Sequence, residues 1–177
     1  MHIRNPATPR RQHGFSLLEI GIVLVIIAVI VAVVLARGAS TSAASNAANE
    51  TQDVIGIIGD LTGLKAAGTY GPAGTNLVPT VITENDVPGD WSSSGGTTLT
   101  NNAGGAVTAV SNGNTYTLTS GNYTAQECVH VAQGVSESGA VTTSVNGGAG
   151  ITGALTAAAA TTGCKSATNS IAWTSLN

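Results

Sequence analysis

The pattern of apolar residues divides the chain into an N-terminal helical part and a C-terminal part with short alternating runs. From Phe15 to Ala36 the chain is apolar on all sides, which is typical of a membrane helix. At 1.5 Å per residue this run is about 33 Å long, enough for a hydrocarbon core of about 30 Å. No proline occurs between Pro9 and Pro72, so we expect the helix to continue to about Ala67.

Beyond Gly38 the pattern becomes amphipathic, and this change predicts a helix that packs on a sheet. The expected buried stripe consists of Ala44, Ala47, Ala48, Val54, Ile55, Ile58, Leu61 and Leu64. Gly56, Gly59 and Gly63 lie near one face of this helix. They either allow close approach to a sheet or a neighbouring helix, which we favour, or they weaken the helix end.

The C-terminal part, residues 68–177, predicts a head of short strands and helices. The expected helices are Leu77–Val87, ended by Pro88-Gly89, and a helix from the capping box Thr124–Glu127 to about Gly134. The expected strands are 97–100, 106–110, 115–119, 141–145 and a last strand with Ile171 and Trp173. Ser111-Asn112-Gly113-Asn114 predicts a hairpin, and the stretch that ends at Gly163 is expected to be flexible.

A basic leader precedes the apolar helix, and one carboxylate lies within the first turns of that helix. Residues 1–14 hold three arginines and no acid, and Glu19 is the fifth residue after Gly14. A carboxylate at the centre of a membrane helix costs about 2.5–3.5 kcal/mol, and less near an end, so it usually has a partner. Cleavage after Gly14 would free an α-amino group at Phe15, with an ordinary pKa of about 7.7–8.0. This amine could pair with Glu19 of the same chain or of a neighbouring copy.

Three other interpretations of this segment remain open. Residues 16–19 fit a helix capping box, and the whole segment could be an uncleaved single-pass anchor. A secretory signal peptide fits less well, because the 22 apolar residues exceed the usual core of about 7–15. The glycine also precedes that core, whereas a signal peptide is cut after it.

Charge and composition indicate an exported protein. The whole chain carries a net charge of −3, and without residues 1–14 it carries −6. Such a surface does not suggest general nucleic-acid binding, which needs clustered lysine and arginine. Only 8% of residues are charged, as expected of an exported β-rich protein rather than a cytoplasmic enzyme. The arginines of the leader place the N-terminus in the cytoplasm and the head across the membrane.

The two cysteines of the chain, Cys128 and Cys164, predict a disulfide, because an exported domain with one pair usually oxidises it. The loop of about 36 residues would contribute at most about 4 kcal/mol of stability. Two buried free thiols are the alternative. A metal site is disfavoured, because Cys128 and His130 are only two ligands and the other histidines lie in the leader.

The sequence implies no cofactor and no catalytic set. Residues 148–153 match the dinucleotide pattern G-x-G-x-x-G. That pattern requires an acid about 20 residues further on, and no Asp or Glu follows Glu137. We therefore reject this motif and expect a protein that is not an enzyme.

Gly14, Phe15, Ser16 and Glu19, with the basic leader and the long apolar helix, resemble the processing site of type IV prepilins. The resemblance implies cleavage between Gly14 and Phe15 by prepilin peptidase and N-methylation of Phe15. It also implies that Phe15 and Glu19 direct assembly with other copies, on an inner-membrane assembly platform, into an extracellular filament.

The resemblance implies a domain order and a fold class. We expect a leader over 1–14, a transmembrane and assembly helix over 15–36, its amphipathic continuation over 37–67 and a head over 68–177. The paired cysteines match the disulfide-bounded region of such pilins, here 128–164. The fold is therefore expected to be α+β, a long helical spine packed on an antiparallel sheet.

The expected function is that of a major pilin, for adhesion or conjugation-type cell contact. The helix-borne Cys128 and the segment from Tyr70 through Trp91 resemble the type IVb class, including thin pili of conjugative plasmids. Phe15 as first mature residue and a 14-residue leader are nearer to type IVa. We favour type IVb. The alternatives are a minor pilin, a type II secretion pseudopilin, or an uncleaved single-pass envelope protein.

Overall fold

A computed structural model describes residues 17–176, without the side chains of residues 17–20, 22–23 and 33–42. The chain divides after Ser40, and the part from Thr41 onwards is one compact head. Helix α1 spans Leu17–Gly63 and so ends slightly before the expected Ala67. In the part of the chain that the structure describes, no helix is long and apolar enough to cross a membrane. The predicted membrane helix over 15–36 lies partly outside the described residues.

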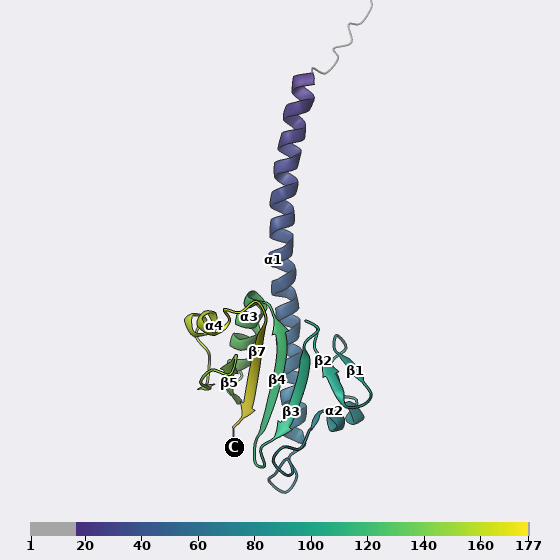
Figure 1. The fold of residues 1–177 in the computed structure, drawn as a ribbon, viewed down its shortest axis with the longest axis vertical. Coiled ribbons are helices and arrows are strands. Elements are labelled where there is room, and N and C mark those ends of the chain that lie inside the picture. The colour runs from purple at the N-terminus through teal and green to yellow at the C-terminus, as the bar shows by residue number, and fades with distance from the viewer. Residues whose placement is uncertain (1–16, 177) are drawn as a thin grey trace, which may run out of the picture. The chain divides into compact units, whose positions relative to one another are not determined.

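The head contains a seven-stranded sheet in the order β1-β2-β3-β4-β7-β5-β6, and every neighbouring pair is antiparallel. The strands are β1 Ser92–Ser94, β2 Thr98–Thr100, β3 Ala106–Ser111, β4 Tyr116–Tyr123, β5 Val141–Val145, β6 Ile151–Thr152 and β7 Asn169–Ser175. Strand β7 follows all the others in sequence, yet it lies between β4 and β5 and joins them (Figure 1). The expected α+β fold with an antiparallel sheet is confirmed.

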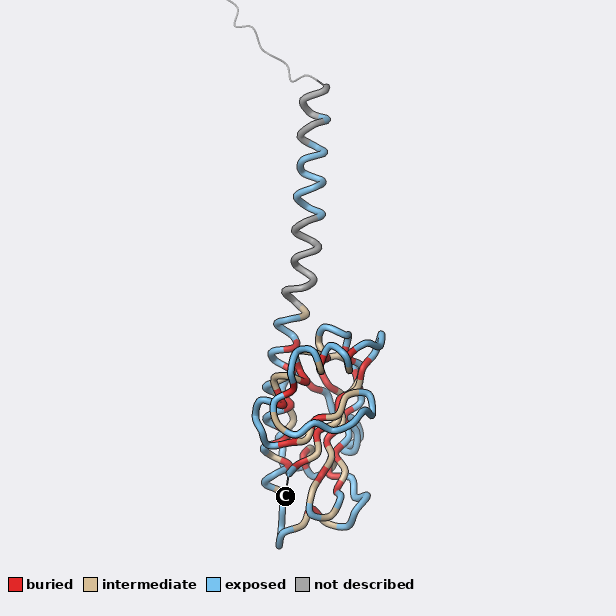
Figure 2. Tube along the Cα trace, turned by 90° about the vertical axis from the view of Figure 1, so that its left-hand side faces the viewer, coloured by how far each residue is buried: buried red, intermediate tan, exposed pale blue. Residues whose placement is uncertain are grey.

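The central strands of the sheet alternate between a buried and a more exposed face. Along β7 the buried residues are Asn169, Ile171, Trp173 and Ser175, and the residues between them are partly exposed. The C-terminal half of α1 and helix α3 (Ala125–Ser136) cover the buried face, and the core lies between the helices and the sheet (Figure 2). The period of two in the sequence thus places one face of β2, β3, β4, β5 and β7 in this core, whereas β1 and β6 are exposed along their whole length.

Helix α1 presents a narrower buried stripe to the sheet than we expected. Its core residues from Thr41 onwards are Ala47, Val54, Ile57, Ile58 and Leu61. Ala44, Ala48 and Ile55, which we placed in the stripe, are exposed. Close approach of the glycine face to the sheet is also wrong, because no atom lies within 4 Å of a Cβ added at Gly56, Gly59 or Gly63. The glycines therefore lie on the outer face of α1.

The capping box at the start of α3 is confirmed. Thr124 Oγ1 accepts a hydrogen bond from the Glu127 N–H, and the Glu127 carboxylate accepts one from the Thr124 N–H. Gly134 lets α3 approach α1 closely, because a Cβ at this position would lie 2.6 Å from Thr51 Cγ2. The close approach of these two helices therefore requires glycine on α3.

Several short elements differ from the sequence-based expectation. Helix α2 is Val78–Glu84, shorter than the expected 77–87. The stretch that ends at Gly163 was expected to be flexible, but it forms β6 and helix α4 (Ala157–Gly163). The expectation failed because β6 is only two residues long and exists through its pairing with β5. Strand β1 was missed for the same reason, since it pairs only with β2.

Candidate functional site

The N-terminal site predicted from the sequence lies mostly outside the described residues. Gly14 and Phe15 are outside them. Glu19 lies in α1, but its side chain is not described. The pairing of the Phe15 amine with Glu19 therefore stays a prediction.

The described part of α1 near this site carries a dense apolar surface. Seven large side chains between Leu24 and Val31 are 49–65% exposed. Soluble single chains rarely expose such a contiguous apolar surface, and where they do, it marks an interaction with lipid or protein. This stretch of helix therefore requires a cover that a single chain does not provide.

The predicted disulfide between Cys128 and Cys164 is confirmed, and the alternative of two free thiols is wrong. Cys128 lies in the first turns of α3, and Cys164 follows α4 directly. Their Cα atoms are 5.8 Å apart, and both side chains are buried. The bond joins the two helices that bound the region 128–164. His130, the only histidine after the leader, is exposed on α3.

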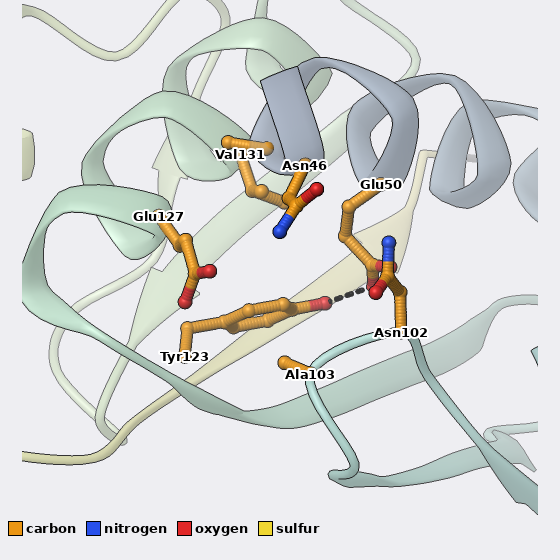
Figure 3. Close-up of a pocket in the computed structure, with 8 residues that line it drawn as sticks. Asn46, Glu50, Asn102, Ala103, Tyr123, Glu127 and Val131 are labelled. Carbon is orange, nitrogen blue, oxygen red and sulfur yellow. Dashed lines mark hydrogen bonds between the residues drawn. The ribbon is translucent and has the colours of Figure 1, made fainter. Parts of the chain in front are cut away.

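A buried carboxylate that the sequence analysis missed connects α1 to the sheet and to the loop before β1. Glu50 of α1 is only 3% exposed. Its Oε1 accepts a hydrogen bond from the Tyr123 hydroxyl at 2.6 Å, and its Oε2 accepts one from Trp91 Nε1 at 3.0 Å (Figure 3 shows the tyrosine bond). Three segments far apart in the sequence thus meet at one side chain.

The polar network continues from Tyr123 toward the β2–β3 turn. The Tyr123 hydroxyl also lies 2.6 Å from Ser120 Oγ, which accepts a hydrogen bond from Asn101 Nδ2 at 2.8 Å. Asn101 Oδ1 in turn accepts the Gly105 N–H. A phenol has one proton and can donate to one acceptor at a time. The state of Glu50 therefore decides whether Tyr123 donates its proton to Glu50 or to Ser120.

A cavity of about 50 Å³ lies beside the Glu50 carboxylate, between α1, α3, β4 and the β2–β3 turn (Figure 3). Asn46, Asn102 and Glu127 contribute polar groups to its wall. Pockets for small organic ligands are usually about 300–1,000 Å³. This cavity has room for a few water molecules only, so the Glu50 network is a structural connection and not a substrate pocket.

Three carboxylates of α1 have raised pKa values. Burial raises the pKa of Glu50 above its ordinary 4.5, and hydrogen bonds from Tyr123, Trp91 and the Asn102 backbone act in the opposite direction. Burial, and then the negative charge of Asp90, raise the pKa of Asp53 above 3.8. Burial and the nearby Asp86 and Glu84 do the same for Asp60. Negative charges on α1 thus face those on α2 and the segment after it.

We expect the head to become more stable as the pH falls from 7 toward the ordinary pKa values of 4.5 and 3.8. Each raised pKa means that the folded state binds the proton more tightly than the unfolded state. The stabilisation is complete below the unfolded pKa and is lost as the pH rises through the folded pKa. Urea unfolding of the detergent-solubilised chain at a series of pH values measures this. A midpoint that falls steadily on acidification from pH 7 would contradict the assignment.

The rejected motif over residues 148–153 begins after β5, contains β6 and ends one residue beyond it. The two strands form an antiparallel pair. A dinucleotide motif requires a parallel strand–helix–strand unit. The rejection therefore agrees with the fold around the motif.

Comparison with known proteins supports one class for this combination of helix, sheet and disulfide. Residues 44–176 match the family model described as PilS N terminal, and residues 9–35 match the prokaryotic N-terminal methylation motif. The fold is similar to the crystal structure of a type IV b pilin from Salmonella typhi, with a TM-score of 0.52 and 21% identity. That match covers 75% of this chain and 97% of that chain. No curated protein matched.

An α+β head of this topology, preceded by a methylation motif, defines a type IV pilin. The family model described as PilS N terminal covers most of the chain. The chain therefore belongs to the PilS family of type IV pilins.

Proposed function

We propose that this chain is the major structural subunit of a type IVb pilus, a surface filament for adhesion or conjugation-type cell contact. The exposed apolar surface between Leu24 and Val31 carries this proposal, because it needs lipid or other copies to cover it. The match to the N-terminal methylation motif over residues 9–35 supports the same conclusion. The role is structural and not enzymatic.

Assembly proceeds in this proposal through the N-terminal helix. Prepilin peptidase cuts between Gly14 and Phe15 and methylates the Phe15 amine. Before assembly the helix lies in the inner membrane with its N-terminus in the cytoplasm. The assembly platform then moves the subunit into the filament, where helices of other copies replace lipid. A buried charge pair between Phe15 and Glu19 contributes more to register than to net stability.

The first experiment is to determine the N-terminal residue and intact mass of protein sheared from the cell surface. We expect a chain that starts at Phe15, carries one extra methyl group and lacks the two hydrogens lost on disulfide formation. High abundance in sheared filaments separates a major pilin from a minor pilin or a pseudopilin. A chain that retains residues 1–14 and occurs only in membranes would support the uncleaved anchor and overturn the proposal. Replacement of Gly14 by leucine is the matched variant and should leave the leader attached.

Replacement of Glu19 by alanine should leave cleavage intact and abolish or strongly reduce filament formation. The change strands the Phe15 amine without a partner in an apolar surrounding, which costs about 3–5 kcal/mol per pair for buried pairs. Electron microscopy of sheared fractions, with immunoblots of the membrane fraction, measures both steps. Glu19→Asp, which keeps the charge on a shorter side chain, is the control. Filaments of normal number from Glu19→Ala would refute the register mechanism.

A further inference from the structure

We propose that Asn112, in the turn between β3 and β4, is a site of spontaneous deamidation, while Asn146 is protected from the same reaction. These are the asparagines of the chain that precede glycine. This dipeptide is the most prone to deamidation, because glycine does not hinder attack by its own backbone nitrogen. The reaction takes place in the head and does not depend on the proposed function.

The reaction uses water and no other co-reactant. The Gly113 nitrogen attacks Asn112 Cγ, a new carbon–nitrogen bond closes a five-membered ring, and the side-chain nitrogen leaves as ammonia with the proton of the Gly113 N–H. Water then opens the ring at one of its two carbonyls. The product is aspartate or isoaspartate, and in either case a neutral amide has become a carboxylate with one negative charge.

The surroundings of Asn112 leave room for this ring. The Asn112 side chain is exposed, and its Nδ2 donates one hydrogen bond, to Thr117 Oγ1 at 2.9 Å. Gly113 has a φ of +90°, and no atom lies within 4 Å of a Cβ added there. The Gly113 N–H donates a hydrogen bond to Ser111 Oγ at 3.0 Å. This hydroxyl oxygen is therefore an acceptor beside the proton that the Gly113 nitrogen loses when the ring closes.

The surroundings of Asn146 hold its amide in place. Nδ2 donates to the Gly163 carbonyl at 3.0 Å and to Asn169 Oδ1 at 2.9 Å, and Oδ1 accepts the Ser170 N–H at 2.9 Å. Gly147 is as open as Gly113, with a φ of +71° and no atom near an added Cβ. The two sites therefore differ in the bonds of the asparagine amide and not in the space around the glycine. All three bonds must break before Asn146 can close a ring.

Deamidation at Asn112 would affect a contact of the head. The Gly113 carbonyl accepts hydrogen bonds from the Tyr70 N–H at 2.8 Å and from Thr69 Oγ1 at 3.0 Å. Isoaspartate adds a methylene to the backbone just before Gly113 and so displaces this carbonyl. The segment that follows α1 would lose its attachment to the hairpin as copies of the protein age.

The test is to incubate the full-length detergent-solubilised protein at mildly alkaline pH and follow both sites by peptide mass spectrometry. In the folded protein we expect Asn112 to react roughly 10- to 100-fold faster than Asn146, as two additional hydrogen bonds imply. In urea the two rates should converge, because the bonds of Asn146 are then absent. Equal rates in the folded protein, or no reaction at Asn112 before unfolding, would overturn the proposal.

Hydrogen exchange at the Tyr70 amide is the second readout. Its exchange should become faster in aged wild-type protein. Asn112→Gln is the matched variant, because glutamine closes the corresponding larger ring far less readily. Its Tyr70 amide should keep the initial exchange rate under the same incubation. Equal acceleration in the variant would show that the change at Tyr70 has another cause and would refute the proposed consequence of the modification.

Discussion

Replacement of Glu50 by alanine is expected to lower the free energy of unfolding of the head by about 2–5 kcal/mol. The change leaves Trp91 Nε1 and the backbone N–H of Asn102 without their acceptor in a buried site, whereas the Tyr123 hydroxyl keeps Ser120 Oγ as an acceptor. Each unpartnered buried donor costs about 1–3 kcal/mol. Alanine is the better helix former, so helix propensity acts against the loss and cannot cause it. Urea unfolding, followed by tryptophan fluorescence, measures the effect.

Glu50→Gln is the matched control, and we expect it to be as stable as the wild type or more stable at pH 7. The glutamine oxygen can accept from Trp91 Nε1, and its amide nitrogen can donate to the Tyr123 oxygen. Tyr123 then donates its proton to Ser120 Oγ, 2.6 Å away. Trp91 Nε1 and the Tyr123 hydroxyl thus stay paired while the buried charge is removed. The variant should also show a weaker pH dependence, because a group with a raised pKa no longer titrates. Equal losses in both variants would show that the charge itself is essential.

Replacement of both Cys128 and Cys164 by serine should cost about 4 kcal/mol, as the chain-entropy model gives for a loop of this size. The bonded residues are 36 positions apart. A loss of this size is a large share of the roughly 5–15 kcal/mol that stabilises a typical domain. We expect a strongly reduced midpoint of urea unfolding and a low yield of folded protein after export.

The region around α4 should respond first to loss of the disulfide. Helix α4 packs chiefly on α3, and the bond to Cys128 lies directly at its C-terminal end. Hydrogen exchange over residues 157–163 should therefore accelerate more than exchange in β3 and β4. The wild type treated with reductant under native conditions is the control, because its buried sulfurs should resist reduction until the head unfolds. Unchanged exchange over 157–163 in the double serine variant would contradict this account.

Features with local signals could be predicted from the sequence. The β3–β4 hairpin follows from Asn112-Gly113 between alternating runs, and α3 follows from Thr124 and Glu127 three residues later. The disulfide followed from the export signals and the count of two cysteines. In each case the information lies within a few residues or in the composition, so the prediction required no knowledge of tertiary contacts.

The Glu50 network could not be predicted, because its partners are distant in sequence. Tyr123 lies 73 residues and Trp91 lies 41 residues from Glu50. A glutamate in an amphipathic helix is normally a solvent-facing residue, and nothing local marks this one as buried. Glu50 lies four residues before Val54, which belongs to the buried stripe of α1, and this spacing was the one available signal of its burial.

The short elements near the edges and after β5 were missed for an energetic reason. Strands β1 and β6 contain three and two residues, and such segments are stabilised by their neighbours and not by intrinsic preference. Helix α4, in contrast, has a local sequence signal, since Thr156 caps it and four alanines follow. The predicted close approach of the α1 glycines to the sheet was wrong, because spacing alone does not say which face of a helix the sheet covers. Their approach to a neighbouring helix stays a prediction.

The position of β7 in the sheet has a consequence for how the subunit matures. A chain is made and exported from its N-terminus, and its segments can begin to fold in that order. Strands β1–β4 and the β5–β6 hairpin form two separate pieces until β7 pairs with both β4 and β5. The strand that joins them emerges after every other strand of the described sheet. A prematurely terminated chain therefore leaves strand edges open and stays recognisable to proteases, so only chains that have passed this point yield a closed head.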